Sequence, residues 1–156
     1  DHEKRWDRTL MMKLFMPMLL FLLTAVFAEA QQNTGITLYI KIEGFKSEDG
    51  LCRLLLFEGK KGFPDSRENA ALMLSGSIQK KSAEFSFKIR PGIYAIAALH
   101  DENSNGKMDK TWYGKPLEGF GSSNNPKVGS GPPGFKESSA SIDENNNHFN
   151  IKLNYF

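Results

Sequence analysis

The sequence predicts an all-β protein, a single antiparallel β-sandwich of about seven strands. Short apolar or alternating stretches are separated at regular spacing by Gly, Pro, Asp and Asn, and no stretch has the period of an amphipathic helix. The 156 residues are 40% hydrophobic and 24% charged, which is typical of a globular domain and too apolar for disorder. A chain of this size can bury enough surface to fold without disulfides.

An N-terminal segment is expected to be removed from the mature protein. Residues 13–27 begin with a basic residue and continue as an apolar run, shorter than the roughly 20 residues that a membrane span needs. Ala28-Glu29-Ala30 then places small residues at the two positions that a signal peptidase reads. These features predict a secretory signal peptide that is cleaved before Gln31, and a secreted protein with no membrane span after cleavage.

The rest of the chain divides into an upstream piece and one domain. Residues 1–10 are mostly charged and contain no Met, so they are interpreted as upstream sequence, with the true start at Met11 or Met12. Residues 31–156 are enough for one domain. The net charge of the chain is only +2 and no basic run is present, which argues against nucleic acid as a partner. The one cysteine, Cys52, lies in an apolar run and is expected to be a buried thiol.

Seven stretches are expected to form the strands: 36–43, 51–57, 72–79, 83–89, 93–99, 138–142 and 148–155. The first alternates cleanly between apolar and polar residues, as a strand with one face in the core should. The second and fifth hardly alternate, which predicts burial on both faces, and the fifth is expected at the centre of its sheet. Asp49-Gly50 and Pro91-Gly92 are the clearest turn signals between strands.

A loop with regularly spaced oxygen donors follows the expected central strand. Donors stand at positions 1, 3, 5, 7 and 9 of this loop, and they are the side chains of Asp101, Asn103, Asn105 and Asp109 and the carbonyl of Lys107. Calcium binds six to eight oxygens, and a Gly at position 6, here Gly106, permits the sharp turn around the ion. The spacing therefore predicts a weak calcium site, with a Kd on the order of 10⁻⁴ to 10⁻³ M.

The match to a calcium loop is incomplete. Position 12 is Trp112 instead of a bidentate Glu, and Glu118 would have to complete the shell from a distance. The alternative is that Asn105-Gly106 forms a hairpin turn and the Asp and Asn side chains cap backbone amides, with no metal.

His100 opens this loop and is expected to be a hydrogen-bonded structural residue. A hydrolase that uses His100 and Glu118 is a remote alternative, because catalytic partners must lie within hydrogen-bond reach of each other or of one water. No nucleophile elbow, zinc-binding helix, Cys pair or phosphate loop is present in the sequence. We therefore expect no enzyme activity.

Residues 111–135 form a long connection rich in Gly and Pro that also carries aromatic residues. Trp112, Tyr113, Phe120 and Phe135 argue for an ordered segment, because disordered linkers avoid aromatic residues. These rings either staple the loop onto the sandwich or form a ligand platform for a sugar or peptide.

Several motifs taken together resemble the DUF2141 family of uncharacterised bacterial secreted proteins. The motifs are His100-Asp101-x-Asn103-x-Asn105-Gly106-x-x-Asp109, Gly114-x-Pro116-x-Glu118-Gly119-Phe120, Ser123-Asn124-Asn125, Gly131-Pro132-Pro133-x-Phe135, Gly62-Phe63-Pro64 and Pro91-Gly92-x-Tyr94. Ser122 stands where the family more usually has an aromatic residue. The resemblance implies an immunoglobulin- or transthyretin-like sandwich exported to the bacterial periplasm or the medium, and it implies no activity.

Two functions are compared on these grounds. The first is a secreted non-enzymatic module that holds calcium in the loop from Asp101 to Asp109 and presents its loops to a protein or glycan of the cell envelope. The second is a structural or adhesion-type envelope domain whose loop is held by hydrogen bonds alone. The first is the preferred prediction, with Ca²⁺ as its only cofactor.

Overall fold

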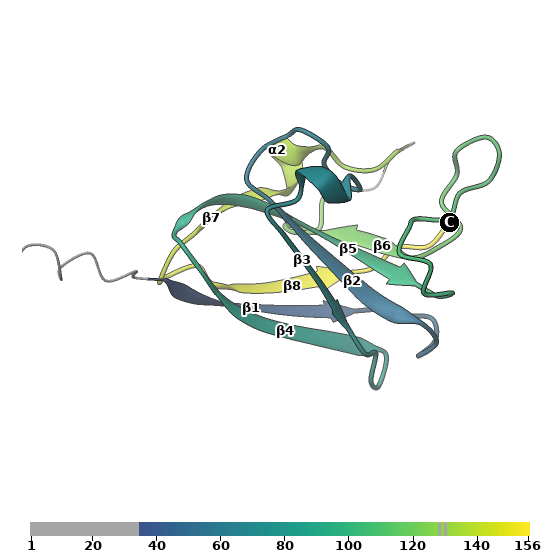
Figure 1. Cartoon of the computed structure of the whole chain (residues 1–156), viewed down its shortest axis with the longest axis horizontal. Helices are drawn as coiled ribbons and strands as arrows, with labels where there is room; N and C mark the ends of the chain where they lie inside the picture. Colours follow the sequence, from purple (N-terminus) through teal and green to yellow (C-terminus); the bar gives the residue numbers. More distant parts are fainter. Residues whose placement is uncertain (1–34, 128, 130) are drawn as a thin grey trace, which may run out of the picture. The chain divides into compact units, whose positions relative to one another are not determined.

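The computed structural model describes residues 35–127, 129 and 131–156, which form eight strands in two sheets (Figure 1). The strands are β1 (Ile36–Glu43), β2 (Leu51–Phe57), β3 (Leu72–Gly76), β4 (Ser82–Ile89), β5 (Gly92–Asp101), β6 (Phe120–Ser122), β7 (Ser139–Ile142) and β8 (His148–Lys152). The helical segments are a 3-10 turn, η1 (Arg67–Asn69), and one turn of helix, α2 (Phe135–Ser138). The predicted signal peptide and upstream residues lie outside the described residues. No helix among the described residues is both long and apolar enough to cross a membrane.

The strands form two layers. One sheet has the order β4-β1-β8, and the other has the order β3-β2-β5-β6, with β7 pairing β5 on the edge that β6 also uses. Every described pair is antiparallel except that of β1 with β8, which is parallel. The predicted all-β sandwich is therefore confirmed, as is the central position of the fifth strand, which pairs β2 on one side and β6 and β7 on the other.

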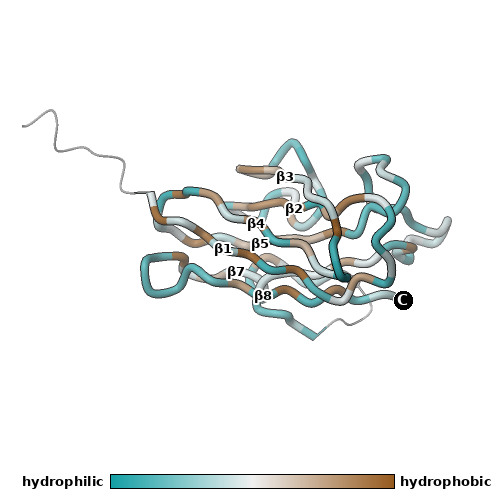
Figure 2. Tube along the Cα trace, turned by 90° about the horizontal axis from the view of Figure 1, so that it is seen from below, coloured by the Kyte–Doolittle hydropathy of each residue, from teal (hydrophilic) through white to brown (hydrophobic). Residues whose placement is uncertain are grey.

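The main core lies between the two sheets. The inward residues of β1 (Leu38, Ile40 and Ile42) meet those of β2 and β5 there, and all three are nearly or fully buried. Burying one such side chain contributes roughly 1.5–3 kcal/mol, so the alternation in β1 is enough to fix which face points inward. Figure 2 shows the hydrophobic segments along the strands and the hydrophilic ones in the connecting loops.

A smaller apolar cluster covers the outer face of the larger sheet. Leu55, Phe57 and Ala97 are buried there because Phe63 and Phe135 pack over them from the loop after β2 and from α2. Phe63 meets both Phe57 and Phe135 edge to face, with ring centroids 5.3 and 5.9 Å apart. This cover explains why β2 and β5 are apolar on both faces.

The structure also corrects some strand limits. Phe120–Ser122, expected to belong to a long connection, is strand β6, and it gave no alternation signal because it has three residues with Gly121 at its centre. A Cβ at Gly121 would lie 2.6 Å from the carbonyl oxygen of Lys152, so close packing on β8 requires glycine there. β3 ends at Gly76 instead of residue 79, and β8 ends at Lys152, beyond which Asn154 makes an isolated bridge to Phe120.

Candidate functional site

His100 is a fully buried residue near the end of β5, with both ring nitrogens engaged. Its Nε2 lies 2.8 Å from the carbonyl oxygen of Asp49, which can only accept, so Nε2 carries the proton. Its Nδ1 lies 2.8 Å from the hydroxyl of Tyr155, and that hydroxyl accepts a bond from the main-chain N–H of Lys46 at 3.1 Å. Phe45 packs edge-on against the imidazole. These contacts make His100 a strut between the β1–β2 loop and the C-terminal segment.

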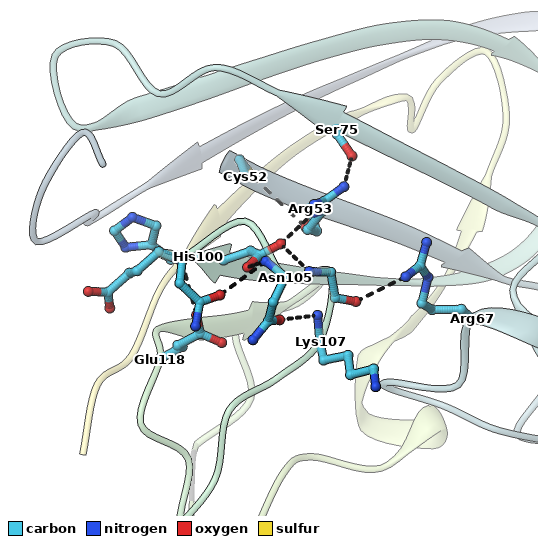
Figure 3. A network of polar contacts seen from close by, with 12 residues as sticks. Cys52, Arg53, Arg67, Ser75, His100, Asn105, Lys107 and Glu118 are labelled. Atoms are coloured by element: carbon cyan, nitrogen blue, oxygen red, sulfur yellow. Dashed lines mark hydrogen bonds and ion pairs between the residues drawn. The ribbon is translucent and has the colours of Figure 1, made fainter. Parts of the chain in front are cut away.

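Asp101 is the fully buried last residue of β5, and it organises the loop that follows. Figure 3 shows the polar contacts of this region, among them those of Arg53, Asn105 and Lys107. Oδ1 of Asp101 accepts the main-chain N–H of Asn105 at 3.0 Å, and its Oδ2 accepts that of Gly106 at 2.8 Å. The Nε of Arg53, on the neighbouring strand β2, donates to the same Oδ2 at 2.8 Å, while Nη1 of Arg53 donates to Ser75 on β3. The buried carboxylate thus has a charged partner and two backbone donors, which is how a buried charge is made tolerable.

Glu118 is a second buried carboxylate and joins the two ends of the loop. Its Oε1 accepts the main-chain N–H of Glu102, and its Oε2 accepts that of Asp109, both at 2.9 Å. Its side chain is only 4% exposed. Glu118 therefore holds residues 102 and 109 together and closes the loop between them.

The other side chains predicted to bind calcium, those of Asn103, Asn105 and Asp109, do lie together. They form hydrogen bonds with one another and with the backbone of the loop. The amide nitrogens of Asn103 and Asn105 donate to the Asp109 carboxylate at 2.6–3.1 Å. The amide oxygens of the same residues accept the main-chain N–H groups of Asn105 and Lys107 at 3.0 and 2.8 Å. This is the capping pattern of the metal-free alternative.

A calcium ion would have to displace several of these contacts. Asn103 and Asn105 would need to turn their oxygens inward, and Asp101 already accepts three donors, one of them a guanidinium. No group of three or more His, Cys, Asp or Glu side chains with the spacing of a metal site occurs among the described residues. Calcium binding at this loop stays a prediction, and the observed geometry lends more support to the hydrogen-bonded loop.

The side chains of His100 and Glu118, the pair considered for hydrolysis, are not hydrogen-bonded to each other. Each makes its hydrogen bonds with other partners in the described part of the chain: Tyr155 and Asp49 for His100, and the N–H groups of residues 102 and 109 for Glu118. The structure therefore assigns both side chains structural contacts.

A cavity of about 450 Å³ lies on the outer face of the larger sheet, beside this loop. Its lining includes residues of the loop from Gly106 to Met108 and apolar side chains from four strands, namely Leu55, Met73, Ala97, Leu99 and Phe120. The size is that of a small-molecule site, and the mostly apolar lining fits one as well.

The rim of this cavity is basic. Five cationic residues, Arg53, Arg67, Lys107, Lys110 and Lys115, face a single acid, Asp65, among the lining residues. Arg53 is paired with Asp101, and Lys110 lies 3.0 Å from Asp65. The other three make no ion pair within the described residues, so the rim keeps an excess of positive charge.

The four aromatic residues expected in a ligand platform have different surroundings. Phe135 packs over the outer cluster, and Phe120 is buried and stacked on Phe156 with ring centroids 5.6 Å apart. Tyr113 is 61% exposed and lines the cavity with Phe120, whereas Trp112 is 95% exposed and lies outside its lining. Only Tyr113 and Phe120 share a site.

The Ser123-Asn124-Asn125 motif has a structural role. The hydroxyl of Ser123 bonds the backbone of Ile96 and Ser138, and the Asn124 amide donates to the carbonyl of Ser139 at 2.9 Å. Asn125 accepts the N–H of Lys152 at 2.8 Å. The motif ties β6 to β5, β7 and β8.

Sequence reasoning missed the cavity because its lining comes from four strands and from loops that are far apart in the chain. One signal was present: Arg53 interrupts the apolar run of β2, and a cation in such a run indicates a nearby buried carboxylate. Met73 and Arg67 carried no such signal.

The family model described as an uncharacterized protein conserved in bacteria, DUF2141, matches residues 40–150. The matched range contains the Asp101–Asp109 loop, Glu118 and all the aromatic residues predicted for the platform. No curated protein and no solved structure matches the chain.

Proposed function

The chain belongs to the DUF2141 family of uncharacterised bacterial proteins, and we propose a function for it from the cavity, since membership of this family assigns no activity. The proposed function is that of an exported, non-enzymatic module that binds a small anionic amphiphile. Export rests on the signal peptide expected from residues 13–30. The single observation that carries the binding role is the apolar cavity of about 450 Å³ with its basic rim.

The lining supports an apolar ligand body with an acidic group at one end. Leu55, Leu99 and Phe120 offer apolar contact at the floor, where each buried methylene of a ligand contributes about 0.8 kcal/mol. Lys107 and Arg67 stand on the rim, where a phosphate or carboxylate can meet cations that form no ion pair in the described residues. A neutral sugar would make little use of the apolar floor of the cavity, and it has no charge to interact with the cations of the rim.

The loop beside the cavity is held rigid, which favours binding. Asp101 and Glu118 bind four main-chain N–H groups of residues 102–109, and Arg67 donates to the carbonyl oxygen of Gly106 at 3.2 Å. A wall that is ordered before the ligand arrives loses little entropy on binding.

Binding without catalysis fits the residues that line the cavity. The lining contains no His, Cys or Glu, and its one acid, Asp65, is on the exposed rim and paired with Lys110. A nucleophile with a base at hydrogen-bond distance, which hydrolysis requires, is not found among these lining residues.

The test is calorimetric titration of the chain starting at Gln31, since residues 35–156 hold both sheets and both apolar clusters. Octyl phosphate below its micelle limit should bind one to one, and octyl glucoside and inorganic phosphate should each bind at least about tenfold more weakly. Arg67→Gln with Lys107→Gln should weaken octyl phosphate by roughly tenfold. Lys88→Gln on β4, in the other sheet, is the matched control. If octyl glucoside bound as tightly as octyl phosphate, the anionic group would have no part in recognition. If neither amphiphile bound, the proposal would be excluded.

Calcium at the loop is the second candidate, favoured by the convergence of Asp101, Asn103, Asn105 and Asp109. Thermal unfolding of the same chain in EDTA, in ~5 mM calcium and in ~5 mM magnesium separates the two ideas. A site of ~0.1 mM affinity would add roughly 2 kcal/mol, by RT ln(1 + [L]/Kd), and Asp109→Ala should remove that gain. A midpoint that calcium leaves unchanged would exclude the cation.

A further inference from the structure

Residues 110–117, here called the 110–117 hairpin, project from the two sheets beside the C-terminal end of the chain (Figure 1). Lys110 and Pro116 form an isolated antiparallel bridge, and Thr111 N–H donates to the carbonyl of Lys115 at 2.8 Å. Gly114 closes the turn at the tip with φ +87°, and its N–H donates to the carbonyl of Thr111 at 2.9 Å. The tip is therefore an ordered turn with Trp112 and Tyr113 at its centre.

The hairpin exposes large apolar side chains that the fold does not use. Trp112 is 95% exposed, Tyr113 61% and Leu117 57%. The two aromatic rings contact each other edge to face, with centroids 5.2 Å apart, and Trp112 has no other aromatic partner among the described residues. Trp and Tyr are the residues that settle at the level of lipid headgroups, where an apolar ring with a polar atom is most stable.

Basic residues flank these rings on the same hairpin. Lys110 and Lys115 lie on its two arms, and both line the cavity together with the rim cation Lys107. Two acids lie near them. Asp65 is exposed and paired with Lys110 at 3.0 Å, an exposed ion pair that water and salt weaken. Asp109 precedes Lys110 in the chain, and its carboxylate accepts the side-chain amides of Asn103 and Asn105. Aromatic side chains at a tip with lysines behind them match a negatively charged lipid surface in both apolar character and charge.

We propose that the 110–117 hairpin docks the protein on an anionic lipid surface, with Trp112 and Tyr113 inserted at headgroup depth and Lys110 and Lys115 facing the lipid phosphates. The inference does not depend on the cavity holding a ligand. A protein partner would also use exposed aromatic residues, but the lysines around the tip favour a surface that is uniformly negative.

Trp112 reports on its own docking. The chain has two Trp, at positions 6 and 112, so a chain that begins at Gln31 contains Trp112 alone and lacks the apolar run of residues 13–27, which would bind vesicles by itself. We would titrate this chain with vesicles of phosphatidylcholine and with vesicles that contain about one-quarter phosphatidylglycerol. Trp112 emission should shift to shorter wavelength, and the protein should sediment, with the anionic vesicles only. Raising the salt to about 0.5 M should weaken both effects, since it shortens the screening length to a few ångströms.

Substitutions separate the hairpin from the rest of the surface. Trp112→Ser with Tyr113→Ser should abolish sedimentation, and Lys115→Glu should lower the partition coefficient by about tenfold or more, since each lysine at such a surface contributes roughly fivefold. Tyr39→Ser, on an exposed Tyr of β1, and Lys88→Glu are the matched controls and should bind as the unchanged chain does. Sedimentation without an emission shift would place the contact on another face and overturn the proposal, as would an absence of binding to anionic vesicles. Binding of octyl phosphate in the cavity is a separate measurement, so either proposal can fail alone.

Discussion

Residues 101–109 and the adjoining 110–117 hairpin differ in where their side chains find partners. In the first segment the side chains turn inward: Asp101 is fully buried and accepts three donors, and Asn103 and Asn105 bond the loop to itself. In the second, Trp112 and Tyr113 are exposed, and their rings contact each other edge to face. The polar segment is thus a structural part of the fold, and the aromatic one is available to an external surface. Substitutions in the two segments should therefore have opposite consequences for stability and for binding.

The largest effect is expected at Asp101. Asp101→Asn removes the negative charge that pairs with Arg53. It also places an amide N–H₂ group, itself a donor, against main-chain N–H donors. The free energy of unfolding should therefore fall by about 3 kcal/mol or more. Asp109→Asn, in the same loop, is the control: its partners are exposed amides, and the loss should stay below about 1 kcal/mol. Urea unfolding of both variants measures the difference. Equal losses would mean that the buried carboxylate does not organise the loop.

Glu118→Gln should have the next largest effect, about 2 kcal/mol. One of its two acceptor oxygens becomes a donor that faces a main-chain N–H, and a buried N–H without an acceptor costs about 1–3 kcal/mol. Amide hydrogen exchange should quicken at Glu102 and Asp109 and stay unchanged in β1. Faster exchange throughout the chain, with no excess at these two residues, would contradict the role of Glu118 in closing the loop.

Tyr155→Phe tests the hydrogen bonds that link the β1–β2 loop to the C-terminal segment through His100. The free energy of unfolding should fall by about 1 kcal/mol. The variant removes the hydroxyl that contacts His100 Nδ1 and accepts the N–H of Lys46. Burial raises the pKa of Tyr155, because the charged phenolate is poorly solvated there. A raised pKa in the folded state stabilises the protein fully below the unfolded value of about 10, and the stabilisation is lost as the pH rises through the folded pKa. Stability above about pH 10 should therefore fall more steeply in the unchanged chain than in Tyr155→Phe.

The strands whose residues follow a regular apolar pattern along the sequence were predictable. The alternation in 36–43 fixed the inward face of β1, and the continuous apolar runs indicated that β2 and β5 are buried on both faces. Burial of Cys52 was also predicted correctly, and the same burial raises the pKa of its thiol to about 12. These features are local because the period of a strand is two residues, so a few neighbours carry the signal.

The candidate site was predictable only in part. The spacing of Asp101, Asn103, Asn105 and Asp109 predicted a calcium site, which stays a prediction, and hydrogen bonds join these residues to one another. The spacing did not reveal that Arg53 supplies a positive charge, because Arg53 is 48 positions away and meets Asp101 only through strand pairing. The cavity was not predicted for the same reason, since its floor depends on the pairing of β2 with β5, which are not consecutive in the chain.

The smallest effect on stability is expected at Trp112, the most exposed large apolar side chain among the described residues. Trp112→Ser should change the free energy of unfolding by no more than about 0.5 kcal/mol, because the indole is 95% exposed and loses only its edge contact with Tyr113. Phe135→Ser is the contrasting control, because that ring covers the outer cluster with Phe63 and its removal should cost about 3 kcal/mol. Urea unfolding again measures both. A loss at Trp112 as large as that at Phe135 would mean that the indole packs on the fold in solution, and Trp112 would then not be free to enter a lipid surface.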